Sequence, residues 1–206
     1  MAGVKHGRWF LPETPDVLGL LRAQLAITLE GVDALARWAD GDVPAAEAVQ
    51  QAARRGDPAK RALMQALRAA FVTPFEPEDV FTLSQGVAWI LDQSRDLILE
   101  SEAMASPPDS VMAQMASLLG DALRHVDQAL AHLGHDDDAA TESADAAIEA
   151  ERKLEHVYYQ GMAGLLEVEA RTRRIAQREL YRRCQRIGET VIAVADRVVY
   201  AVVKQS

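Results

Sequence analysis

Apolar side chains recur three or four positions apart along most of this 206-residue chain. That spacing places them on one face of an α-helix, whereas strict alternation would indicate a strand. The first such series is Leu18, Leu21, Leu25, Thr28, Val32 and Leu35. The pattern predicts six long helices, over about 15–40, 44–72, 78–103, 109–133, 137–166 and 172–203.

Glycine and proline mark the ends of these predicted helices. Thr14 and Pro15 suit the N-cap and the first position of the first helix. Gly56-Asp57-Pro58 lies inside the second, where we expect a kink or a break. Pro107-Pro108-Asp109 is the clearest linker, and Gly134 ends the fourth helix.

Six long helices with short connections predict an all-α, antiparallel helical bundle. The proline linker lies near the middle of the chain. We therefore expect two three-helix repeats, residues 1–106 and 107–206, which together form one domain.

The connection between the second and third helices is rich in proline and acid. Pro74 has no backbone N–H and disfavours a helical conformation at Thr73, so the second helix is expected to end near Val72. Pro77 suits a first helical turn, and Glu78 and Asp79 would face the positive end of the helix dipole. These residues predict a tight connection between two helices.

The same residues, Phe71-Val72-Thr73-Pro74-Phe75-Glu76-Pro77-Glu78-Asp79, resemble the hallmark of PhoU-like proteins. They are most similar to the branch encoded beside Pit-type phosphate transporters. The resemblance extends to the fifth helix around 151–158 and the sixth from 179 to 204. It implies a tandem pair of antiparallel three-helix bundles. It also implies a cytoplasmic accessory protein that regulates phosphate transport by binding a Pit-type permease, and a homodimer.

Composition and charge are consistent with this interpretation. Apolar residues make up 49% of the chain and charged residues 26%, as in ordinary globular proteins. The net charge of −9 argues against a nucleic-acid-binding protein. The sequence has one cysteine, no secretory signal and no apolar run long enough to span a bilayer. We expect a cytoplasmic protein, with any membrane contact peripheral at the inner face.

The resemblance also implies pairs of acidic residues four positions apart on the second and third helices of each repeat. Such pairs share a helical face and supply hard oxygen ligands for iron, manganese, magnesium or similar cations. In the first repeat the expected positions hold Ala52 with Gly56, and Ala88 with Asp92. Asp96 adds an acid one turn later. The first repeat therefore lacks most of these ligands.

The second repeat keeps more of the pattern. The expected positions hold Glu151 with Glu155, and Gln185 with Glu189. Positions 52 and 151 are 99 residues apart and positions 92 and 189 are 97 apart, as expected of a duplicated unit. We therefore predict one divalent or iron-type metal ion in the second repeat. The alternative is that these acids are solvated surface charges.

Other features have simpler interpretations. His125, His132 and His135 are interpreted as surface residues, and Cys184 lies on the apolar face of the sixth helix. Eight acids between 136 and 155 and seven arginines between 171 and 186 could offset one another across antiparallel helices. The arginines could instead form a basic face for an acidic transporter loop or an anionic membrane.

Two other classes of function stay open. One is a metal-dependent enzyme on a helical bundle, which would need several placed ligands and an open coordination position. The other is a scaffolding module without a link to phosphate. No phosphate-binding loop or nucleophile motif favours catalysis in the sequence.

Overall fold

The computed structural model describes residues 15–70, 73 and 75–204. These residues form six α-helices and one short 3-10 helix, and the described ranges contain no strand. The all-α fold is thus confirmed. The helices are α1 Val17–Ala39, α2 Ala45–Ala69, α3 Pro77–Ala103, α4 Ser110–His132, α5 Asp137–Gly164 and α6 Arg171–Val203, with η1 Leu165–Glu167 before α6.

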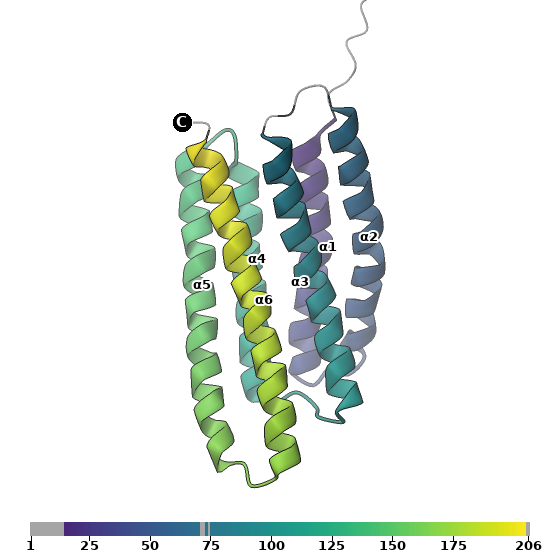
Figure 1. The fold of residues 1–206 in the computed structure, drawn as a ribbon, viewed down its shortest axis with the longest axis vertical. Coiled ribbons are helices and arrows are strands. Elements are labelled where there is room, and N and C mark those ends of the chain that lie inside the picture. Colours follow the sequence, from purple (N-terminus) through teal and green to yellow (C-terminus); the bar gives the residue numbers. More distant parts are fainter. Residues whose placement is uncertain (1–14, 71–72, 74, 205–206) are drawn as a thin grey trace, which may run out of the picture.

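The helices form two antiparallel three-helix bundles that lie side by side (Figure 1). Helices α1 to α3 contact one another, as do α4 to α6. Helix α1 also packs against α4, and α3 against α6. One apolar core runs through both bundles. The predicted division between 106 and 107 falls in the connection from α3 to α4.

Most helix ends match their sequence signals. Pro77 begins α3, and Gly134 follows α4 with φ of 85°. Asp109 caps α4 by accepting hydrogen bonds from two backbone N–H groups. At the start of α1 the cap is Asp16, which accepts from the Gly19 N–H at 2.8 Å. The expectation that Pro15 takes the first helical position is wrong, because α1 begins at Val17 after the Asp16 cap; Thr14 lies outside the described residues.

Of the kink or break that was expected in the second helix, the break is wrong, because α2 continues through Pro58. Proline cannot donate to the carbonyl of Arg54, four residues earlier. Both residues are exposed, so water can reach that carbonyl. Packing of the opposite, buried side, which includes Ala52 and Gly56, stabilises the helix across the missing bond.

None of the helices in the described part of the chain is long and apolar enough to cross a bilayer.

Candidate functional site

The predicted carboxylates of the second repeat meet where α5 packs against α6. Glu151 of α5 is only 3% exposed. Its side chain lies against Gly188 of α6, where an added Cβ would be 3.1 Å from the Glu151 Cγ. Glycine at 188 therefore leaves the space that the carboxylate side chain occupies.

Three carboxylates and one amide surround this point. Burial raises the pKa of Glu151, and repulsion from Glu155 and then Glu189 raises it further. The Gln185 amide donates to Glu189 at 2.9 Å, and the Tyr159 hydroxyl donates to Glu155 at 3.4 Å. The structure thus brings Glu151, Glu155, Gln185 and Glu189 into one neighbourhood.

Glu151 has neither a hydrogen bond nor an ion pair with any residue that the structure describes. A carboxylate with little access to water and no protein partner is stabilised by a proton or a cation. Carboxylate and amide oxygens are ligands that hard cations prefer. Nevertheless, no three His, Cys, Asp or Glu side chains within the described ranges already surround one metal position. The metal site stays a prediction, and metal binding would require these side chains to move.

This arrangement predicts how stability depends on pH in metal-free protein. Because the folded-state pKa of Glu151 is raised, folding favours its protonated form. Wild-type stability should therefore fall as pH rises from the unfolded pKa, near 4.5, through the folded one. In Glu151→Gln this contribution is absent, and we expect the variant to be more stable than wild type by about 1 kcal/mol at pH 7.

Urea unfolding in chelator at pH 4 and pH 7 would measure this difference. The advantage of Glu151→Gln should be small at pH 4 and grow towards pH 7. An advantage equal at both values would contradict a buried, charged Glu151. Glu155, Glu189 and Arg152 are the charged neighbours that act on this group, and they are unchanged in the variant.

The corresponding region of the first repeat is apolar. Ala52 and Gly56 are buried on α2, as the predicted alignment requires, but their neighbour is Leu91 of α3. An added Cβ at Gly56 would lie 2.9 Å from Cδ2 of Leu91. Leu91, Ala52 and Ala53 form a small cluster apart from the main core. A leucine therefore fills the space near the missing ligands.

The two repeats exchange large and small residues at this point. Leu91 and Gly188 are 97 residues apart, the same interval that relates the predicted α3 and α6 ligands. Where the first repeat has Ala52 beside a leucine, the second has Glu151 beside a glycine. In the first repeat the side chain of Leu91, from α3, fills this space. In the second repeat the side chain of Glu151, from α5, fills it. In the first repeat the carboxylate expected at position 52 is therefore absent, and Ala52 there packs against Leu91 instead.

Asp92 and Asp96 belong to a different cluster, on α3. Arg95 forms ion pairs with both, at 3.4 Å and 2.8 Å. Burial raises the pKa of Asp92, and Arg95 opposes that shift; Asp57 and Lys60 of α2 also act on it. One guanidinium of the protein thus already pairs with both acids, which leaves a net charge of −1 on the three groups. Their role as metal ligands stays a prediction, with Arg95 as a competitor.

The remaining candidates show ordinary contacts. The His125 ring lies 3.2 Å from the Gln128 side chain, and the His132 and His135 rings are 5.8 Å apart. Cys184 is completely buried, and burial raises the pKa of its thiol to about 12. A thiol in this state is a poor nucleophile at neutral pH.

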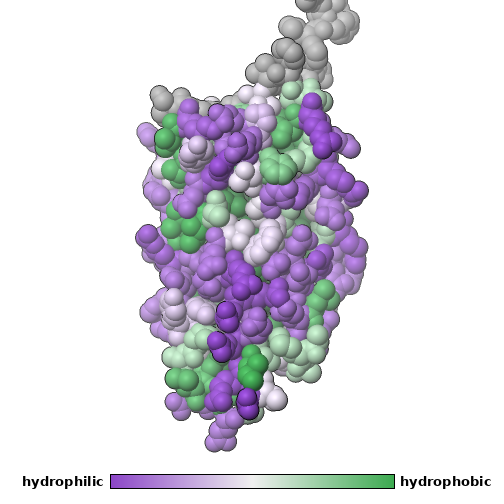
Figure 2. Space-filling view, viewed as in Figure 1, coloured by the Kyte–Doolittle hydropathy of each residue, from purple (hydrophilic) through white to green (hydrophobic). Residues whose placement is uncertain are grey.

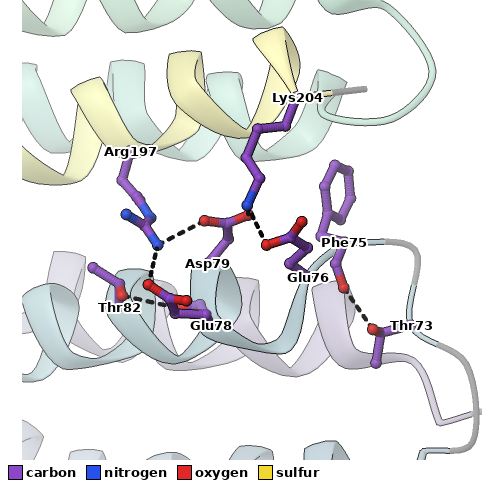
Figure 3. A network of polar contacts seen from close by, with 8 residues as sticks. All are labelled: Thr73, Phe75, Glu76, Glu78, Asp79, Thr82, Arg197 and Lys204. Carbon is purple, nitrogen blue, oxygen red and sulfur yellow. Dashed lines mark hydrogen bonds and ion pairs between the residues drawn. The ribbon is translucent and has the colours of Figure 1, made fainter. Parts of the chain in front are cut away.

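The proline-rich connection contains functional contacts that sequence reasoning missed. Asp79 is buried, with its side chain 3% exposed, and forms ion pairs with one residue of α6 and with the residue that follows this helix. These are Arg197, at 2.7 Å, and Lys204, at 3.4 Å. Figure 3 shows both cations pointing from α6 towards the first turn of α3. Asp79 thus joins the first bundle to the second.

Other residues of the connection support the same contact. Lys204 also pairs with Glu76, and Arg197 with Glu78 at 3.4 Å. The Thr73 hydroxyl donates to the Phe75 carbonyl at 2.5 Å, which closes the turn (Figure 3). Phe71, Val72 and Pro74 lie outside the described residues. We call Asp79, Glu76, Arg197 and Lys204 the interbundle clamp. The spacing of Asp79 suggested a dipole role, and only the fold reveals its partners.

The fold of the chain is similar to that of known proteins, although its sequence is not. No family model matches the chain, and no curated protein matches it. Two solved structures from Shewanella oneidensis MR-1 share its fold: a PhoU-like protein, with a TM-score of 0.79, and a PhoU-like phosphate regulatory protein, with 0.76. Each is 14% identical, and each alignment covers 92% of this chain and 100% of the other. This chain therefore has the fold of PhoU-like proteins, the fold that residues 71–79 predicted.

Proposed function

We propose that this chain is a PhoU-like accessory protein that regulates inorganic phosphate transport by binding a Pit-type permease. The observation that carries the proposal is the fold similarity over 92% of the chain to PhoU-like proteins, one of them described as a phosphate regulatory protein. The amino-acid sequence of residues 71–79 supports the branch of PhoU-like proteins that is encoded beside Pit-type phosphate transporters. On this proposal the protein works in the cytoplasm at the membrane's inner face, as a homodimer.

The proposal assigns binding rather than catalysis. The chain's single cysteine has a buried thiol with a raised pKa, so it does not supply a nucleophile. The clamp acids are engaged by Arg197 and Lys204 and so serve the fold. The unpartnered carboxylate at Glu151 suits retention of a cation.

We further propose that Glu151, Glu155, Glu189 and the amide oxygen of Gln185 hold one hard cation in the second repeat. Burial, and then repulsion from Glu155 and Glu189, raises the Glu151 pKa, and such an ion would offset the repulsion among the three carboxylates. The apolar cluster around Leu91 supports a single site per chain.

A capture experiment tests the transporter proposal. Immobilised protein is mixed with detergent-solubilised phosphate permease from its own host, and the bound fraction is measured. We expect retention at micromolar concentrations. An unrelated permease, prepared in the same detergent, is the control. Equal retention of both, or of neither, would contradict the proposal, and unchanged phosphate uptake in cells lacking the protein would exclude a regulatory role.

A further inference from the structure

The outward face of α6 carries arginines without ionic partners. Arg178, Arg182 and Arg186 are four residues apart, so they lie along one face of the helix. All three are exposed, and none of their side chains forms a hydrogen bond or ion pair with a described residue. Like charges at this spacing repel one another. We call these three residues the arginine row.

Other arginines of α6 differ from the row. Arg183 points to α3, where it pairs with Glu100 and donates to Gln93 at 3.0 Å. Arg197 belongs to the interbundle clamp. These two stabilise the contact between the bundles. The arginine row has no such structural role.

The acidic stretch of α5 does not neutralise the row, so the expectation of mutual offset is wrong. Glu151 packs beside Gly188, which fixes the register of the antiparallel pair. Residues 136–150 therefore lie beside the last turns of α6, beyond the arginines. No ion pair joins 136–155 to 171–186 among the residues described.

Apolar side chains are exposed at the same end of the molecule. Leu166, in η1, is 77% exposed, and Ile175 is 56% exposed. Ile175 lies three residues before Arg178, on the same helical face. The connection from α5 to α6 forms the lower tip of the molecule in Figure 1, and Figure 2 shows hydrophobic residues among hydrophilic ones near that end.

The local charge is opposite to that of the chain. Residues 165–186 contain seven arginines and three glutamates; because Arg183 is paired with Glu100, a net charge of +3 is left, whereas the chain carries −9. The glutamates, Glu167, Glu169 and Glu179, weaken the positive field without reversing it. A basic surface bordered by exposed apolar side chains is typical of proteins that lie on anionic membranes.

We propose that the arginine row, with Leu166 and Ile175, attaches this protein to an anionic lipid surface. The arginines contact the phosphate groups of lipids, and the two apolar side chains enter the boundary between headgroups and acyl chains. The row extends along α6 away from the tip, so the side of the molecule that carries the row, together with the tip, must face the membrane. This attachment is independent of any permease.

Vesicle sedimentation tests the proposal. The full chain is mixed with vesicles of phosphatidylcholine alone, or with 30 mol% phosphatidylglycerol, at low and high salt. We expect binding only to the anionic vesicles and weakening with salt. Replacing all three row arginines by Gln should reduce affinity roughly 100-fold, about 1 kcal/mol per arginine near such a surface. Leu166→Ser with Ile175→Ser should reduce the binding that persists at high salt.

The matched control replaces three exposed arginines elsewhere, Arg37, Arg61 and Arg68, by Gln. None of them forms an ion pair within the described part of the chain. This control loses the same charge and should keep wild-type affinity. An equal loss in both triple variants, or no wild-type binding to anionic vesicles, would overturn the proposal.

Wild-type binding to an acidic peptide but not to anionic vesicles would also overturn it, and would indicate an acidic protein segment as the partner. Because the vesicles contain no protein, failure of this experiment leaves the permease proposal to its own test.

Discussion

Replacing Asp79 by Ala is expected to lower the free energy of unfolding by about 2–3 kcal/mol. The Asp79 carboxylate is buried between Arg197 and Lys204, and its removal leaves those cations without their central partner. Both cations keep some solvent access, which places the loss at the lower end of the range for broken buried pairs. Urea unfolding followed by circular dichroism measures it.

A surface pair provides the control for this prediction. Asp127 pairs with Arg22 at 3.2 Å across α1 and α4, and the Arg22 and Asp127 side chains are 44% and 31% exposed. Asp127→Ala removes the same chemical group and should cost less than about 1 kcal/mol. If Asp79→Ala cost no more than this control, the clamp would not be an energetic link between the bundles. The loss of unfolding free energy in Glu76→Ala should be intermediate, because Lys204 would still form its ion pair with Asp79.

Changing both Glu151 and Glu155 to Gln is expected to abolish the thermal stabilisation by metal. With Mn²⁺ at about 100 times its dissociation constant, binding should add about 2.7 kcal/mol to the wild type. For a chain of this size that corresponds to a rise in Tm of about 5–10 °C. The variant keeps the shapes of both side chains but loses two of three carboxylates, so its Tm should not change with metal.

Thermal scans in chelator and in Mn²⁺ measure both proteins. The matched control changes the exposed acids Glu142 and Glu149 of the same helix to Gln, which should leave the metal-dependent rise intact. Equal melting curves for the wild type with and without metal would contradict the predicted site. If the metal-dependent rise in Tm persisted in the variant with Glu151 and Glu155 changed to Gln, the metal would bind elsewhere. Asp92 and Asp96 would then be the next residues to test.

Local signals predicted the helices well, for identifiable physical reasons. Pro77 and Gly134 act through their own backbone geometry, so their positions predicted the start of α3 and the end of α4. Pro58 misled, because a proline breaks a helix only when packing cannot compensate for the lost hydrogen bond. That compensation depends on which side of α2 is buried, and no local signal reports it.

The site was predicted in part. The four-residue spacing identified Glu151 with Glu155 and Gln185 with Glu189, and the structure places these four side chains together. The spacing of the acids alone left out Arg95, although Arg95 lies within one turn of Asp92 and beside Asp96 on the same helix. It also could not show that Leu91 fills the first repeat, since that contact joins residues about 40 positions apart in sequence, Ala52 and Leu91.

The amino-acid order alone determined the helices, their antiparallel connections, the duplicated plan and the spacing of the carboxylates. These properties arise from backbone geometry and from residues within one helical turn of each other. Only the tertiary structure decided the partners of the buried acids: Asp79 pairs with Arg197 of α6 and with Lys204 at its end, and Glu151 pairs with none of the described residues. The reason is that burial and ion pairing depend on which helices face each other, and packing of the whole chain sets that choice.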